Sequence, residues 1–279
     1  MKMRRLRRKI LQYVLVVLLL AIVLFPFFIM CMTALKDTTE AVQYPPTLWP
    51  HSPTLRNFRD VVNPDIFPIL RYAANSLRIA LSTALLSTTV GGMAAYSIAR
   101  LKFPGRNVFR ESTLLVYMFS GILLIVPLYK IISGIGLNDT FLAVIIADTV
   151  STLPAAIYML SGYFTTIPKE LEDAAMVDGL NRVRVILRIV VPLSVPAISS
   201  TFIYVFMIAW NDFLFAFTFL SSRETLTLSL GLKQLFGTMD YVWGRMMAAS
   251  ILMAAPVIIV FISCEKFIAS GLVAGGVKG

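Results

Sequence analysis

The chain has 279 residues, of which 58% are hydrophobic and only 14% are charged, and its mean hydropathy is +0.80. Soluble domains carry about 25% charged residues, so this composition excludes an ordinary soluble globular protein. The formal net charge is +10. However, the basic residues punctuate apolar runs instead of gathering in one patch, which indicates orientation in a membrane and not nucleic-acid binding.

The first predicted element is a basic N-terminus followed by an apolar run. Residues 2–9 are rich in Lys and Arg, whereas residues 10–35 contain no charged residue. At about 1.5 Å per residue, this run is long enough to cross a hydrocarbon core of about 30 Å. A secretory signal peptide is the alternative, but the run is too long and no A-x-A cleavage site follows it. Residues 1–35 are therefore predicted to be a cytoplasmic N-terminus and a first span.

Residues 36–74 form the longest polar region and are rich in proline. Proline excludes a long helix, so we expect a folded external loop with short turns. The loop is either a docking surface for a soluble partner or a connector packed on the spans. The one histidine of the chain, His51, lies here and is interpreted as solvated.

Residues 75–279 are predicted to form the membrane core, with further spans at 75–99, 109–132, 141–164, 189–220 and 246–267. Gly91 and Gly92 put small residues where two helices can approach closely. Pro192 and Pro196 are expected to kink or break the long fifth segment. The two cysteines, in apolar segments without metal-ligand spacing, are predicted to be buried.

The distribution of basic residues predicts the orientation. With six spans and both termini inside, 16 of the Lys and Arg residues face the cytoplasm and 9 face the other side. This excess agrees with the positive-inside rule. It places the charged loop around residues 168–188 in the cytoplasm.

That loop predicts a short surface helix over residues 168–181. Pro168 suits the first helical turn, and the acidic residues that follow suit the positive end of the helix dipole. Gly179 is a natural helix stop. A short amphipathic helix held at the bilayer surface suits contact with a partner outside the membrane.

The spacing of Asp173-Ala174-Ala175, Gly179 and Ile189-x-x-Pro192 resembles the EAA loop of permease subunits in bacterial ABC importers. Asp173 stands where that family usually has Glu, and Val191 where it usually has Leu. Because Glu172 precedes Asp173, either acid is a candidate for the main contact. The resemblance implies that the loop is a coupling helix that docks on a cytoplasmic ATPase. The implied coupling residues are Glu172, Asp173, Ala174, Ala175, Asp178, Gly179 and Arg182.

The segments YPPT at 44–47 and PTLRNF at 53–58, with the tail at 271–279, resemble carbohydrate-type permeases. The resemblance is to the shorter permease of the maltose-transporter type. It implies an all-α integral membrane protein in the bacterial cytoplasmic membrane. The implied fold has six transmembrane helices of the type I ABC importer permease, with both termini cytoplasmic. The implied partners are a second permease, two copies of an ABC ATPase that bind ATP and magnesium, an external solute-binding protein and a di- or oligosaccharide.

The chain itself is predicted not to be an enzyme and to bind no cofactor. Its sequence has no G-x-x-x-x-G-K-[ST] motif to cradle ATP phosphates. Four residues are candidates for a solute path, namely Asp148, Trp210, Asn211 and Asp212.

Each candidate has an alternative role. A carboxylate within a span is costly unless it is paired, hydrated or protonated, so Asp148 either faces the path or is a hydrogen-bonded packing residue. Trp210 is favoured as an interfacial anchor. A different class, an ion-coupled secondary transporter, would need Asp148 and Asp212 as a relay. A membrane enzyme would need a cluster of catalytic side chains that this sequence lacks.

Overall fold

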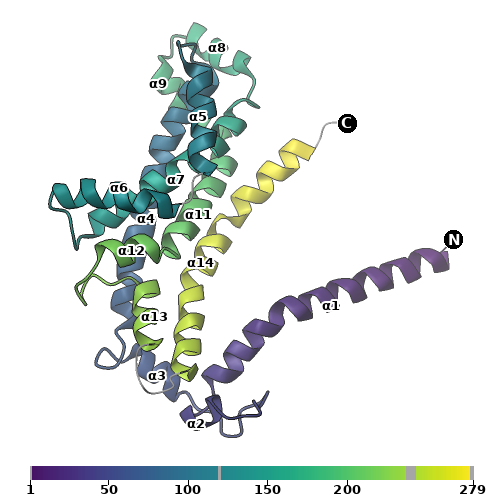
Figure 1. Cartoon of the computed structure of the whole chain (residues 1–279). Coiled ribbons are helices and arrows are strands. Elements are labelled where there is room, and N and C mark those ends of the chain that lie inside the picture. The colour runs from purple at the N-terminus through teal and green to yellow at the C-terminus, as the bar shows by residue number, and fades with distance from the viewer. Residues whose placement is uncertain (1, 119–120, 237–242, 277–279) are drawn as a thin grey trace. The chain divides into compact units, whose positions relative to one another are not determined.

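The computed structural model describes residues 2–118, 121–236 and 243–276, and every regular element in these ranges is a helix (Figure 1). The chain divides into two compact units. Unit 1 comprises residues 1–70 and 231–255, and unit 2 comprises residues 71–230 and 256–279. Among the described residues, four helices are long and apolar enough to cross a membrane, or up to six if each of two bent helix pairs is one span.

Unit 1 begins with α1 (Lys2–Ala34), which confirms the first predicted span. Apolar side chains are exposed all round this helix over residues 10–27, as expected of a helix surrounded by lipid. The prediction that both cysteines are buried was wrong. Cys31 is exposed on α1, and Cys264 is half-buried.

The predicted external loop folds into short turns around α2 (Thr38–Ala41) and α3 (Arg56–Val62). Asn57 of α3 donates hydrogen bonds to the carbonyls of Ala34 at 2.8 Å and Lys36 at 2.7 Å, which pairs carbonyls left open at the end of α1. Glu40 accepts a hydrogen bond from the His51 backbone N–H at 3.0 Å and lies 2.8 Å from its Nδ1. Burial raises the pKa of Glu40, but its hydrogen bonds outweigh this effect and hold the pKa below its usual value.

Unit 2 is built around α7 (Phe141–Phe164), which has the bounds predicted from the sequence. The Thr140 hydroxyl caps its first turn by accepting a hydrogen bond from the Ala143 N–H at 3.3 Å. α5 (Arg106–Met118), α11 (Val195–Trp210) and α12 (Leu214–Phe219) pack against it. α4 (Ile69–Arg100) contains the predicted second span and begins six residues before its predicted start at residue 75.

Two predicted spans are bent and not straight. The third consists of α5 and α6 (Gly121–Gly134), inclined by 101°, and residues 119–120 between them lie outside the described ranges. The fifth was correctly predicted to break at its prolines. It contains a π-helical turn (Ile186–Val190), α10 (Val191–Leu193) and a 79° bend before α11. Pro192 and Pro196 cause this because each lacks an N–H and crowds the preceding turn.

The C-terminal region holds α13 (Leu228–Phe236), which lies outside every predicted span, and α14 (Trp243–Gly276). α14 contains the predicted sixth span and extends beyond both of its ends. At its start, Arg245 forms an ion pair of 2.8 Å with Asp60 of α3, within unit 1. The end of the predicted tail, residues 277–279, lies outside the described residues.

The predicted close approach at Gly91 is confirmed, and it gives a first testable result. A Cβ on Gly91 would lie 2.9 Å from the Cβ of Ala156 on α7, whereas one on Gly92 would lie 3.7 Å from a terminal methyl of Leu160. We expect Gly91→Ala to push α4 and α7 apart and to destabilise the protein by about 1–3 kcal/mol. The control Gly92→Ala should be neutral or slightly stabilising, because alanine favours a helix over glycine. Thermal unfolding in detergent measures both, and equal midpoints would contradict the close approach.

Candidate functional site

The predicted coupling helix is α8 (Lys169–Val177), which lies with α9 (Arg182–Val185) at the top end of unit 2 in Figure 1. Pro168 precedes its first turn, which carries Glu170 and Glu172. The helix ends in a backbone reversal. Gly179 has a φ of +86°, and the N–H of Leu180 donates to the carbonyl of Ala175 at 3.1 Å. Glycine suits this position because left-handed backbone strains other residues.

A second cap fixes the chain after the turn. The Asn181 side chain accepts a hydrogen bond from the Arg184 N–H at 2.9 Å and starts α9. The segment then passes through the π-helical turn and α10 into α11. α8 is therefore joined to a membrane span by a short path in which most residues are helical.

Glu172 fastens α8 to the end of α4. Its carboxylate accepts a hydrogen bond from the Tyr96 hydroxyl at 2.8 Å and lies 2.6 Å from Nε of Arg100. The side chains of Glu172 and Arg100 are only 7% and 5% exposed. Arg100 also donates to the carbonyl of Ile167, just before α8, at 2.7 Å. We name Tyr96, Arg100 and Glu172 the anchor cluster.

An apolar core supports the anchor cluster. The ring of Tyr96 meets that of Phe164 edge-on, with centroids 6.4 Å apart. Leu160, Ile167 and Val190 are buried in the same core. Ends of α4 and α7 and the π-helical turn thus meet under α8, so a displacement of α8 is transmitted to packed helices and not to a loose loop.

The other predicted coupling residues separate into two groups. Ala175 is buried, whereas exposed positions are Asp173, Ala174, Asp178, Gly179 and Arg182. Of the two acids that the sequence left open, Glu172 is held within the chain and Asp173 faces outward. The outward face also carries exposed apolar side chains, namely Leu171, Met176 and Val177.

The predicted solute-path residues lie in less accessible places. Asp148 and Trp210 are each 1% exposed, and Trp210 is stacked on Phe206 with ring centroids 5.9 Å apart. In this conformation Trp210 therefore offers a solute no surface. Asn211 is exposed, but its amide donates to the Met207 carbonyl at 2.8 Å.

Asp212 has a structural task, since its carboxylate accepts hydrogen bonds from the first N–H groups of α12, including that of Ala216 at 2.8 Å. Asp148 lies in α7 and Asp212 lies just before α12, and these two helices pack together. In the described part of the chain, Oδ2 of Asp148 has no hydrogen-bond partner. The two acids thus lie on packed elements, whereas Trp210 stacks on Phe206 and Asn211 bonds to the Met207 carbonyl within α11.

Comparison with known proteins decides the family. Residues 87–271 match the family described as the binding-protein-dependent transport system inner membrane component. The chain belongs to this permease family. This membership excludes the alternative of an ion-coupled secondary transporter. It also shows that the chain is a multi-pass membrane protein.

Relatives and a solved structure agree with this membership. The inner membrane ABC transporter permease protein YcjP of Escherichia coli (strain K12) is 52% identical, over 94% of this chain and 94% of that protein. The trehalose/maltose transport system permease protein MalG of Thermococcus litoralis is 33% identical, over 98% of each. The crystal structure of a bacterial ABC transporter involved in alginate import has a TM-score of 0.77 at 20% identity, covering 92% of this chain and 95% of that one. The predicted resemblance to the maltose-transporter type and the type I permease fold are thereby confirmed.

Proposed function

We propose that this permease forms half of the translocation pore of a bacterial importer for a di- or oligosaccharide. The sugar class is supported by the name of the trehalose/maltose relative, which aligns over nearly the whole of both chains. In this proposal the chain is the shorter member of a permease heterodimer in the cytoplasmic membrane. An external solute-binding protein delivers the sugar.

The energy comes from two copies of a separate ATPase, which bind ATP and magnesium and contact α8. One observation carries this part of the proposal. α8 is fixed from within by Glu172, while Asp173 and the apolar side chains of Leu171, Met176 and Val177 face outward. Val177 is 87% exposed and, with Leu171 and Met176, gives this short helix an apolar patch of the kind that marks interaction sites. Short helices with such faces dock in grooves of partner proteins.

The proposed mechanism is alternating access. Closure of the ATPase dimer on ATP moves α8, and the anchor cluster carries that movement into α4. The turn at Gly179 and the segment from α9 to α10 carry it into α11. The solute path then opens toward the binding protein.

We expect Asp173→Lys to weaken association with the ATPase by reversing an outward charge. The measurement is the amount of ATPase that co-purifies with the tagged permease from membranes in mild detergent. Glu111→Lys is the matched control, because it makes the same charge change at an exposed site on α5. Unchanged co-purification of Asp173→Lys would transfer the contact to the apolar face of α8.

The same purification tests the whole proposal. With the unaltered chain, mass spectrometry should identify an ATPase, a second permease and a solute-binding protein. The ligand of that binding protein then defines the sugar. Recovery of the chain alone, from a preparation that keeps other membrane complexes intact, would contradict the proposal.

A further inference from the structure

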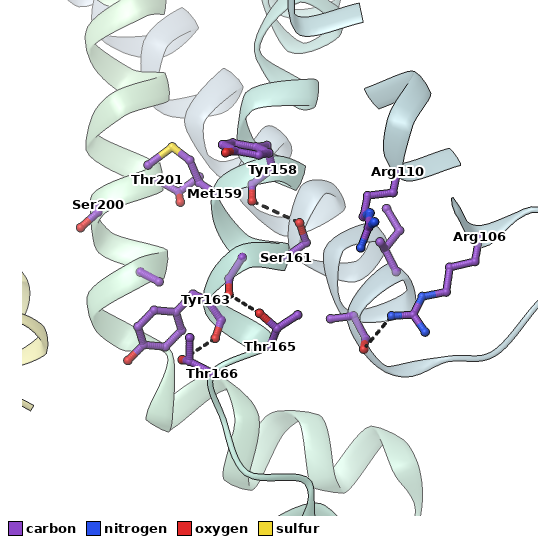
Figure 2. A pocket seen from close by; sticks show the side chains of 14 residues that line it. Arg106, Arg110, Tyr158, Met159, Ser161, Tyr163, Thr165, Thr166, Ser200 and Thr201 are labelled. Carbon is purple, nitrogen blue, oxygen red and sulfur yellow. Dashed lines mark hydrogen bonds between the residues drawn. The ribbon is translucent and has the colours of Figure 1, made fainter. Parts of the chain in front are cut away.

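A cavity of about 790 Å³ lies in unit 2 between α5, α7, α11 and the end of α4. Figure 2 shows Arg106 and Arg110 on one side of it and Ser200 and Thr201 on the other. Its walls are mostly apolar. The cavity adjoins residues 161–166, at the end of α7 that leads into α8, and is therefore separate from the outward face of α8.

Two arginines give this cavity most of its available hydrogen-bond donors. Three hydroxyl groups of the lining donate their protons to backbone carbonyls within α7 and its end: Ser161 to Tyr158 at 3.1 Å, Thr165 to Gly162 at 2.6 Å and Thr166 to Tyr163 at 2.8 Å. Arg106 donates one weak bond of 3.3 Å to the Ala99 carbonyl. Arg110 makes no hydrogen bond or ion pair with any residue that the structure describes.

The two arginines favour an anionic ligand. An arginine has five N–H donors, which match the oxygens of a phosphate. An uncharged sugar would leave the positive charges of both arginines without a counter-ion. The Thr201 hydroxyl, buried and without a hydrogen-bond partner in the described part of the chain, adds a polar group at the inner wall.

From this cavity we propose that the permease binds an anionic glycerophospholipid, with the phosphate at Arg106 and Arg110 and an acyl chain along the apolar wall. Because α8 contacts the ATPase in the proposed function, the end of α7 that leads into α8, and the cavity beside it, lie at the cytoplasmic leaflet. Basic pockets between spans on that side bind anionic headgroups. A free phosphate would use the two arginines but would leave the apolar wall uncovered.

The test uses the intact transporter with its partner subunits, exchanged into phosphatidylglycerol, into phosphatidylcholine, or into their mixture. Native mass spectrometry counts retained lipids, and a photoactivatable phosphatidylglycerol maps the contact. We expect retention of phosphatidylglycerol over phosphatidylcholine, with crosslinks at residues 158–166 and 197–201. The double variant Arg106→Gln, Arg110→Gln should lower this retention about tenfold or more, as loss of two charge-assisted contacts implies.

The control double variant is Lys169→Gln, Arg184→Gln, which removes two exposed charges from α8 and α9, outside the cavity. It should retain phosphatidylglycerol as the unaltered protein does. Equal retention in the Arg106, Arg110 variant, or crosslinks confined to other surfaces, would overturn the proposal. Displacement of the lipid by inorganic phosphate would instead identify a free-anion site. Each of these results leaves the importer function itself unaffected.

Discussion

Arg100→Met is expected to release α8 from the end of α4 and to abolish co-purification of the ATPase. Among the residues that the structure describes, the substitution leaves the buried carboxylate of Glu172 with the Tyr96 hydroxyl as its remaining partner. Removing one member of a buried ion pair costs about 3–5 kcal/mol, because the remaining charge stays desolvated. The protein avoids this cost most easily by moving α8 into water, since α8 is the short outer helix. The hydrogen bond from Arg100 to the Ile167 carbonyl is lost at the same time.

Two further variants separate loss of the anchor cluster from general instability. Lys102→Met removes an exposed charge two residues beyond Arg100, just after α4, and should leave co-purification unchanged. The double variant Arg100→Met, Glu172→Met removes both charges, and apolar replacements of a buried pair are often nearly neutral in stability. The unfolding temperature of the double variant should therefore be higher than the sum of the two single-variant effects predicts.

The double variant also tests the mechanism. If it regains both stability and ATPase binding but fails to support uptake, the ion pair is needed to transmit movement. Recovery of uptake as well would reduce the pair to a structural role. An Arg100→Met permease that binds the ATPase normally would contradict the anchoring of α8. Tyr96→Phe should have a smaller effect. It removes one hydrogen bond to a charged group, which lowers the free energy of unfolding by about 1.5–3 kcal/mol.

The anchor cluster also marks the limit of what the sequence could predict. The bounds of α7 follow from local signals, because Thr140 caps one end and the apolar run stops before Pro168. The end of α8 likewise follows from Gly179. In contrast, Tyr96 and Glu172 are 76 positions apart, and no local pattern connects them. A basic residue at the end of a span looks like a surface charge until its partner is known.

The same reasoning explains the errors in the spans. Pro192 and Pro196 predicted a break, but no local pattern predicted a π-helical turn at Ile186–Val190, just before the first of them. The α5–α6 bend has no proline at the junction, so hydropathy alone predicted one helix. Hydropathy also did not predict α13, because this segment is shorter and less apolar than a membrane span. Trp210 looked like a path or interface residue because the sequence does not show that Phe206 covers its ring.

Gly179→Pro is expected to leave membrane insertion intact but to uncouple ATP hydrolysis from uptake. Proline fixes φ near −65°, whereas Gly179 has a φ of +86° and donates its N–H to the Met176 carbonyl at 3.1 Å. Apart from its chain neighbours, no described residue has an atom within 4 Å of where a Cβ would stand, so we expect the damage to be confined to the backbone between α8 and α9. Gly179→Ala should have a smaller effect, since left-handed backbone costs an L-residue about 1–2 kcal/mol.

Gly136→Pro is the matched control for this variant. Gly136 also has a positive φ, of +76°, with open space at its Cβ position and an N–H bonded to the Ser133 carbonyl at 3.0 Å. It lies in the turn between α6 and α7, away from α8. The measurements are ATP hydrolysis by the reconstituted transporter and uptake of the sugar that its binding protein carries. If both variants lose hydrolysis and uptake equally, the effect is general backbone strain. If Gly179→Pro alone hydrolyses ATP without uptake, this turn is the rigid link between the ATPase and the pore. Normal uptake in Gly179→Pro would exclude that role for the turn.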